Sequence, residues 1–427
     1  MSRFRNLKIL APVKRIAKKW IAFRNAVRHQ LQPKLKTYSD RPENKKRALL
    51  CYLLDAVDMK DSDPRLKGHA NWWRGREIAR ILDSLGYNVD VISSGDSSTI
   101  PSRQYDLIFD ASANIPRLAS FQKKETKFVL FLTGSYYGWS SPAEMRRILA
   151  FETTHGVFYE PRYGRQPKLI MDKALAMSDL ALLVGNETTL HTYPDWARKN
   201  MRIVHMPTSF IEHRKQYGSR SDTFLYYSSA RNVLKGLDLV FDAFLEHPEW
   251  NLVVVGPVES TEADFFRAYP NLSSHPNIQL LGSMVPSSEW FAEVLDRCDA
   301  FLLPSCSEGA SSSALTCCIA GIYPIISRNS GVDLTENTGI WIESLTKSGV
   351  EKAIETFRQK DWSEVVREAE TIRSYIAKWH SRKSFTEEMT DILSKLDKAP
   401  LPSRNPSATH AWVKNLPPDV SNNHLFS

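Results

Sequence analysis

A chain of 427 residues predicts two or three domains, and its 42% hydrophobic and 24% charged residues are typical of a globular protein. This composition excludes the collagen-like, disordered and disulfide-scaffold classes. The net charge is +8, but residues 1–36 hold eleven Lys and Arg and no acid, and removing them leaves −3. The basic character therefore belongs to the N-terminal segment, which argues against a nucleic-acid-binding surface on the folded domains.

The N-terminal segment has the pattern of a basic amphipathic helix. Over residues 12–31 the apolar residues recur at steps of mostly three and four, with Lys and Arg largely between them. We expect this arm to bind an anionic membrane, which would place the protein in the cytoplasm, peripherally on the inner membrane face. A solvated basic helix, a transit peptide and a nucleic-acid-binding arm are the alternatives. Residues 37–46 are typical of a polar linker, so the arm and linker together span 1–46.

From residue 47 onward, short apolar runs alternate with amphipathic stretches. Such runs are typical of strands in parallel sheets that helices cover on both faces. The strands expected are 47–54, 88–93, 105–112, 127–134, 180–186 and 202–207, then 223–229, 251–257, 278–282, 300–305, 323–327 and 339–344. We therefore predict an α/β fold with two doubly wound, Rossmann-like domains, over 47–215 and 220–382, that face a cleft. The Pro-rich, polar tail over 398–427 is expected to be disordered.

Two cations follow the first predicted strand of the second domain. Arg231 and Lys235 stand four residues apart at the entry to a helical stretch, and two cations at the carboxyl end of a strand suit a diphosphate. The alternative is an ordinary solvated helix start.

A second polar segment follows the predicted strand 300–305. Glu308 lies at the carboxyl end of this strand, where its carboxylate could accept hydrogen bonds from sugar hydroxyls. Ser311, Ser312 and Ser313 then open an apolar helix, and the free N–H groups at a helix start favour an anion. The alternative is a helix capped by Ser311 or Ser312, with Glu308 as a solvated loop acid.

Metal and redox chemistry lack their usual signatures. The five cysteines form no C-x-x-C pair and have no neighbouring His cluster, so we expect buried, reduced thiols, no metal and no cofactor. Asp61 and Asp63 are interpreted as a pair of loop acids rather than as metal ligands. No apolar run reaches the ~18 residues that span a bilayer, and the first 30 residues lack the apolar core of a secretory signal.

Two motifs resemble those of a known family. Two runs resemble the second domain of the GT-B glycosyltransferases of family 4, a retaining group: KGLDLVFDAF over 235–244, and PSCSEG with AGIYPIIS over 304–327. A third run is similar to a first-domain start in a polysaccharide-synthesis branch, namely GHANWWRGREIARILDSLGYNVDVI over 68–92. The resemblance covers roughly 47–395. It implies a helix over 383–397 that crosses back to the first domain.

The resemblance also implies roles for individual residues. A nucleotide-sugar donor would lie on the second domain, with Arg231 and Lys235 on its diphosphate and Glu308 near the transferred sugar. The donor-binding residues would be Gly309, Ala310, Ser311, Ser312 and Ser313, with Thr316 at the ribose position.

The sequence departs from the family pattern at three places. Thr316 stands where a second glutamate is usual, and it cannot accept a bidentate pair of hydrogen bonds. The first-domain loop offers only Gly68, followed by His69, Ala70 and Asn71. Thr133-Gly134-Ser135 stands where a histidine is often found. These departures affect donor identity and leave the acceptor side unassigned.

Three further residues are candidates for the acceptor side of the cleft. His69 and Asn71 lie in the loop that faces it, although a satisfied loop histidine is an equal interpretation. Asn186 is the last residue of the predicted strand 180–186, and its alternative role there is a helix N-cap.

The resemblance implies a glycosyltransferase of cell-surface polysaccharide biosynthesis. Its expected partners are a nucleotide-sugar donor, a glycan or lipid-linked acceptor and an anionic membrane, and no nucleic acid. A catalytically weak scaffold of the same fold, suggested by Thr316, and a nucleotide-sugar epimerase are the alternatives.

Overall fold

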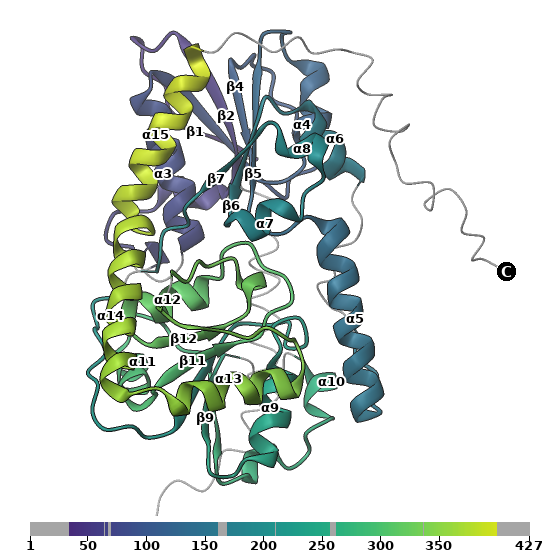
Figure 1. Cartoon of the computed structure of the whole chain (residues 1–427). Coiled ribbons are helices and arrows are strands. Elements are labelled where there is room, and N and C mark those ends of the chain that lie inside the picture. Colours follow the sequence, from purple (N-terminus) through teal and green to yellow (C-terminus); the bar gives the residue numbers. More distant parts are fainter. Residues whose placement is uncertain are drawn as a thin grey trace, which may run out of the picture.

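The chain folds into two stacked α/β domains (Figure 1). The structure is a computed structural model, and it describes residues 34–398 except 64, 67–69, 161–168, 210, 257–261 and 336. The predicted fold class, two doubly wound α/β domains, is confirmed. Residues 1–33 of the predicted arm, and the predicted tail beyond 398, lie outside the described residues.

The first domain is built on a seven-stranded sheet in the order β1-β3-β2-β4-β5-β6-β7. Strands β2 to β7 run parallel, and β1 pairs antiparallel with β3 at the edge. The strands are β1 (Leu35–Ser39), β2 (Lys46–Tyr52), β3 (Tyr87–Ser93), β4 (Leu107–Asp110), β5 (Lys127–Leu132), β6 (Leu180–Val184) and β7 (Met201–Val204). Nearly every residue of β3 to β6 is buried, as expected for strands that helices cover on both faces.

The helices of the first domain connect these strands. They are η1 (Leu54–Asp58), α3 (Ala70–Ser84), α4 (Ile115–Leu118), η2 (Ala119–Phe121), α5 (Tyr137–His155), α6 (Leu169–Met177), α7 (Glu187–His191) and α8 (Asp195–Arg198). Helix α5 is followed by Gly156, whose left-handed φ of 66° suits a C-cap glycine.

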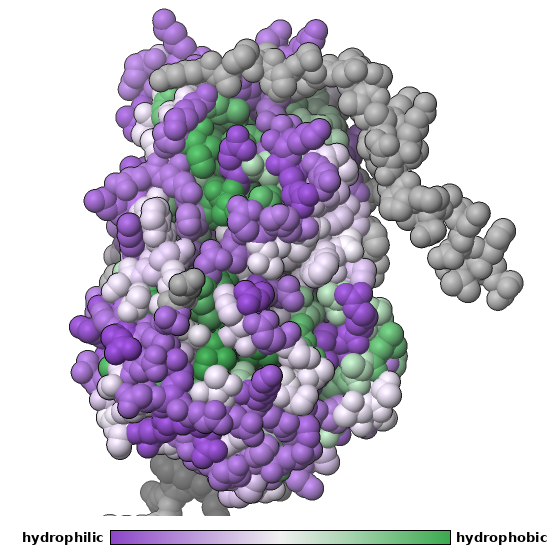
Figure 2. Space-filling view, in the orientation of Figure 1, coloured by the Kyte–Doolittle hydropathy of each residue, from purple (hydrophilic) through white to green (hydrophobic). Residues whose placement is uncertain are grey.

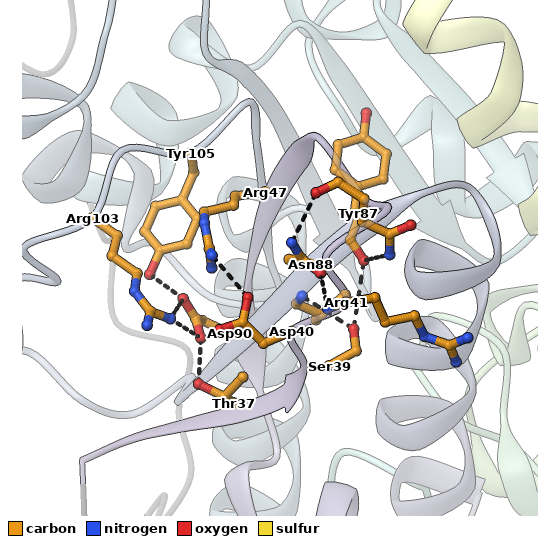
Figure 3. Close-up of polar contacts among 12 residues, drawn as sticks. Thr37, Ser39, Asp40, Arg41, Arg47, Tyr87, Asn88, Asp90, Arg103 and Tyr105 are labelled. Atoms are coloured by element: carbon orange, nitrogen blue, oxygen red, sulfur yellow. Dashed lines mark hydrogen bonds and ion pairs between the residues drawn. The ribbon is translucent and has the colours of Figure 1, made fainter.

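The edge strand β1 corrects the prediction of a linker over 37–46. That prediction is wrong for residues 37–39, because buried Asp90 on β3 holds them in the sheet. Asp90 accepts hydrogen bonds from Thr37 Oγ1 at 2.7 Å and from Tyr105 at 2.9 Å, and it pairs with Arg103 at 3.1 Å (Figure 3). The first domain therefore starts at β1, in front of residue 47.

The second domain has a six-stranded, fully parallel sheet in the order β10-β9-β8-β11-β12-β13. Its strands are β8 (Thr223–Tyr227), β9 (Asn251–Val255), β10 (Ile278–Gly282), β11 (Ala300–Leu303), β12 (Tyr323–Ile326) and β13 (Ile340–Trp341). Its helices are α9 (Leu237–Glu246), α10 (Ala263–Phe266), η3 (Leu272–Ser274), α11 (Glu289–Arg297), α12 (Ser312–Ala320), η4 (Arg328–Ser330), α13 (Lys347–Gln359) and α14 (Trp362–Trp379). The chain order changes direction at β8, whose neighbours are β9 and β11, and this is where open α/β sheets bind ligands.

Two helices tie the domains together. After α14 the chain enters α15 (Arg382–Lys398), which packs on α3 and β7 of the first domain (Figure 1). On the other side, α5 of the first domain carries Phe151 onto Phe265 of α10, with ring centroids 5.5 Å apart. One buried apolar cluster therefore includes residues of both domains.

The surface and the thiols give further information. All five cysteines are buried and free, as the sequence predicts. Hydrophilic residues cover most of the face in Figure 2, with hydrophobic side chains visible mainly in recesses. Among the described residues, no helix combines the length and the apolar character that a bilayer crossing requires.

Candidate active site

A cavity of about 730 Å³ lies between the two domains. Its second-domain wall is built from residues that follow the carboxyl ends of β8, β9, β10 and β11, and its first-domain wall comes from the start of α3 and the end of β5. Residues that line it include Asn71, Arg74 and Thr133 on one side and Ser228, Lys235, Ser283, Glu308 and Ser311 on the other. The cavity is therefore at the position where the strand order reverses, as the sheet topology predicts.

Lys235 and Glu308 form an ion pair at this wall. Lys235 Nζ lies 3.5 Å from Glu308 Oε1, and both side chains are about one-seventh exposed, at 14% and 15%. The turn after β8 brings them together: Gly236 has a φ of 74°, and a Cβ there would lie 2.5 Å from the carbonyl oxygen of Pro304. Only glycine allows this close approach between the two strand ends.

The start of α12 forms the adjacent part of the wall. Ser311 is the N-cap, since its hydroxyl accepts a hydrogen bond from Ala314 N, and Ser312 and Ser313 also line the cavity. The first amides of a helix have no intrahelical partner and carry partial positive charge. The wall therefore combines the ammonium of Lys235 with a helix N-terminus, a setting that favours a phosphate.

The loop after Glu308 rests on the first domain. A Cβ at Gly309 would lie 2.7 Å from the carbonyl oxygen of Thr133 and 2.8 Å from that of Val184. Thr189 Oγ1 donates to the carbonyl oxygen of Gly309 at 3.0 Å, and Ser135 donates to that of Glu308. Contact with the ends of β5 and β6 thus fixes the position of Glu308.

The structure separates Arg231 from Lys235. The guanidinium of Arg231 lies 3.4 Å from the carboxylate of Glu144 on α5, and its backbone N–H donates to Glu262. Arg231 has a left-handed φ of 75°, and it is not among the residues that line the cavity. The two cations expected to share a diphosphate therefore point to different surroundings in this structure.

Of the other residues predicted for the site, some line the cavity and others do not. Gly309 and Thr316 do not line the cavity, and Thr316 is buried within α12. Asn186 is the N-cap of α7, the alternative role considered for it. Its side-chain amide also donates a hydrogen bond to Asp333 at 2.8 Å. Ala310 and Asn71 line the cavity, whereas His69 lies outside the described residues.

Sequence reasoning missed several residues of the wall. Ser228 and Ser229 follow β8, and Arg65, Arg74 and Met284 also line the cavity. The pair of serines stood at the end of a predicted strand, a position that by itself signals a ligand contact. Arg74 lies inside an amphipathic helix, and its charge there is indistinguishable from that of a solvated face.

The acids near the first-domain loop are neutralised by arginines. Asp61 pairs with Arg76 at 2.7 Å, and hydrogen bonds from Arg65 lower the pKa of Asp63 to about 2. Among the residues that the structure describes, no group of three or more His, Cys, Asp or Glu is arranged to hold a metal ion.

Comparison with known proteins identifies the second domain. Residues 209–379 match the family model described as Glycosyl transferases group 1. The GDP-mannose:cellobiosyl-diphosphopolyprenol alpha-mannosyltransferase of Xanthomonas campestris is 25% identical over 186 residues, which cover 41% of this chain and 48% of that protein. The match in Xanthomonas oryzae pv. oryzae, a protein with the same description, is 23% identical over 185 residues, 41% of this chain and 48% of that protein. The chain thus spans about half the length of the curated relatives it matches.

Solved structures resemble the whole two-domain arrangement. Sucrose-phosphate synthase from Thermosynechococcus elongatus has a TM-score of 0.60 at 14% identity, over 83% of this chain and 99% of that one. The Anabaena protein HepE in complex with UDP and glucose has a TM-score of 0.52 at 13% identity, over 82% and 99%. At these identities the likeness concerns the fold. Residues 209–379 therefore match the Glycosyl transferases group 1 family, within a chain that has the two-domain GT-B fold.

Proposed function

We propose that this protein is a glycosyltransferase that moves a sugar from a nucleotide-sugar donor to a glycan or lipid-linked acceptor in cell-surface polysaccharide synthesis. The observation that carries the proposal is the ion pair of Lys235 and Glu308 beside the start of α12, at the wall of the interdomain cavity. The group 1 match over the same domain supports it.

The donor would lie on the second-domain wall. Lys235 and the first turn of α12 would stabilise the diphosphate, because charge develops there when the bond to the sugar breaks. Glu308 would accept hydrogen bonds from hydroxyls of the transferred sugar and would hold Lys235 in place until the donor arrives. Arg231 would reach the diphosphate only if it left Glu144. The donor site is therefore assigned first to Lys235 and Glu308.

The transfer would retain the anomeric configuration, as in the family that the sequence resembles. The bond between the anomeric carbon and the diphosphate oxygen breaks while an acceptor hydroxyl attacks from the same face. The proton of this hydroxyl passes to the departing phosphate oxygen, so the products are the glycoside and the nucleoside diphosphate. The electrostatic support of the leaving group by Lys235 supplies a large part of the rate.

The names of the relatives suggest the substrate classes. Those in Xanthomonas use GDP-mannose and a diphosphopolyprenol-linked sugar, and the Anabaena structure holds UDP and glucose. Donors based on both guanosine and uridine diphosphate are accordingly the first to test, and a diphosphate-linked lipid is the first acceptor.

Substitution of the ion pair tests the donor site. We expect Lys235→Ala and Glu308→Ala each to lower kcat by about 10²-fold or more. The first removes the charge that stabilises the leaving diphosphate, and the second removes the group that holds both Lys235 and the transferred sugar. The measurement is donor turnover with the nucleoside diphosphate product as readout, and Lys123→Ala, on an exposed first-domain lysine, is the matched control. Turnover like that of the wild type in both variants would refute the assignment.

The two alternative functions have their own readouts. Calorimetric titration with uridine and guanosine diphosphate sugars separates an enzyme from a scaffold, because absence of binding favours the scaffold. Thr316 in place of the usual glutamate is the feature that suggests a scaffold. Incubation with donor alone separates a transferase from an epimerase, since only the epimerase converts the sugar without an acceptor.

The N-terminal arm is proposed to hold the protein on the inner membrane face. Each of its basic residues would contribute about 1 kcal/mol near an anionic surface. Deletion of residues 1–33 should release the protein from vesicles that contain phosphatidylserine and leave donor binding intact. Co-sedimentation that survives the deletion would contradict this role.

A further inference from the structure

Among the residues that the structure describes, Arg74 on α3 is a buried cation without an acidic partner. It is 3% exposed and lines the interdomain cavity. Its Nη2 donates to the amide oxygen of Asn71, while Nε and Nη1 have no hydrogen-bond partner in the part of the chain that the structure describes. Arg76 and Arg80 on the same helix pair with Asp61 and Glu77, whereas none of the ion pairs among the described residues includes Arg74.

Such a group is unfavourable in a folded protein unless something compensates for it. Burial removes the hydration of a charge, and an unpaired buried cation loses more than a neutral side chain of the same size would. The guanidinium lies over the ring of Phe131 at 5.6 Å, which compensates in part, because a cation–π contact is weaker than an ion pair. The remaining deficit indicates a site that an anion completes.

The position of Arg74 indicates which ligand brings the anion. Lys235 and the start of α12 lie on the second-domain wall, where the proposed function places the donor diphosphate. Arg74 lies on the first-domain wall, and the other arginine there, Arg65, is already paired with Asp63 at 2.6 Å. Among the described residues of the cavity wall, the uncompensated positive charge is therefore on the side away from the proposed donor site.

We propose that Arg74 binds an anionic group, a phosphate or a carboxylate, carried by the acceptor. This inference rests on the proposed function and adds the chemical class of its acceptor. The anion replaces the amide oxygen of Asn71, which also lines the cavity, because a charged oxygen is a much stronger partner for a guanidinium than a neutral one. An acceptor whose sugar carries a phosphate or a uronate group satisfies this requirement.

Binding of small anionic sugars tests the proposal. The full-length protein is saturated with guanosine or uridine diphosphate and then titrated with glucose 1-phosphate, glucuronate and the neutral methyl glucoside. We expect one anionic sugar to bind at least about tenfold more tightly than the neutral one, and the better of the two identifies the acceptor group as phosphate or carboxylate. Arg74→Met should abolish this preference, and Arg74→Lys should restore part of it. Arg76→Met, on an arginine of the same helix that pairs with Asp61 and does not line the cavity, should keep it.

Each other outcome has a definite meaning. An anionic preference that survives in Arg74→Met, or its absence in the wild type, overturns the proposal. Loss of nucleoside diphosphate affinity in Arg74→Met assigns Arg74 to the donor and also overturns it. Failure of the wild type to bind either nucleoside diphosphate refutes the proposed function instead, and the two failures are thereby distinguished.

Thermal stability separates ligand binding from a structural role. Arg74→Met removes the unpaired charge but keeps most of the side-chain volume, and its sulfur replaces the guanidinium beside the ring of Phe131. We expect the melting temperature of the protein alone to rise, as happens when a buried charge is replaced by an apolar side chain. A clear fall would show that Arg74 serves the fold and would overturn the proposal.

Discussion

Gly309 occupies the point at which the second domain touches the strand ends of the first. A Cβ there would meet two backbone carbonyl oxygens, of Thr133 and Val184, at 2.7 and 2.8 Å. Backbone cannot move aside as a flexible side chain can, so any larger residue must displace the loop that carries Glu308.

We therefore expect Gly309→Ala to destabilise the protein by about 1–3 kcal/mol, in the range of other overpacked sites. It should also raise the KM for the donor, because Glu308 moves with the loop. Urea unfolding and donor kinetics measure the two effects. Gly218→Ala is the control, since a Cβ at Gly218 meets nothing within 4 Å. An unchanged unfolding midpoint for Gly309→Ala would show that the two domains are not held at this contact.

The sequence predicts the place of a single residue in the cavity wall when its position relative to a strand end decides that place. Lys235, Glu308 and the serines of α12 follow strand ends, and strand ends share one edge of a parallel sheet. Arg231 was not predictable in this way, because its partner Glu144 lies 87 residues earlier on a helix of the other domain. The burial of Thr316 and the cap formed by Asn186 depend in the same way on contacts that spacing does not reveal.

Helix α5 shows the same limit for a whole element. The local sequence does not reveal the partner of this helix. The structure places its buried face on α9 and α10 of the second domain, where Arg147 pairs with Asp238. Both side chains of this pair are buried, at 10% and 3% exposure, and burial raises the pKa of Asp238 to about 6.

The pair predicts a large effect of a single substitution. Arg147→Met should destabilise the protein by about 3–5 kcal/mol at pH 8, because it leaves the Asp238 carboxylate buried without its partner. The loss should be smaller at pH 5, where Asp238 can take up a proton and become neutral. Urea unfolding at the two pH values measures both effects, and Arg146→Met, on the exposed neighbouring residue, should change little. An equal loss at pH 5 and pH 8 would mean that the cost arises from packing rather than from charge.

Strand β1 is an element that the sequence analysis missed. Its five residues are polar or half-buried, because an edge strand presents only one side to a neighbour. Its place in the sheet depends on Asp90 and Tyr105, more than fifty residues later, whose hydrogen bonds are drawn in Figure 3. The local pattern of hydrophobic residues therefore does not reveal this hydrogen-bond network.

At the scale of the whole molecule, the chain crosses between the domains twice at one place. The first crossing follows β7 and the second joins α14 to α15. His380 connects them: its Nδ1 donates to the carbonyl oxygen of Met206 at 2.9 Å, and its carbonyl oxygen accepts from Thr208 N, also at 2.9 Å. The sequence predicts two domains and their order, but their mutual placement depends on contacts of this kind. Any opening of the cleft must bend the chain at these two crossings.

The burial of His380 has a consequence for stability. The side chain is 5% exposed, and burial lowers its pKa from 6.5 to about 4. Between these two values the unfolded chain binds a proton that the folded chain does not, so protonation favours unfolding as the pH falls. The difference of about 2.5 pKa units corresponds to at most about 3 kcal/mol lost between pH 7 and pH 4. Asp238 acts in the opposite direction over the same range, because its folded pKa is raised.

Replacement of the imidazole isolates its contribution from that of Asp238. His380→Gln keeps a donor for the carbonyl oxygen of Met206 but cannot be protonated, so it should lose less stability than the wild type as the pH falls from 7 to 4.5. The measurement is the urea midpoint of both proteins across this range, in which the effect of Asp238 cancels. His191→Gln, at a side chain that is 67% exposed, should run parallel to the wild type. Parallel curves for His380→Gln as well would mean that His380 takes up its proton without disturbing the crossing, and that the connection between the domains tolerates a charge there.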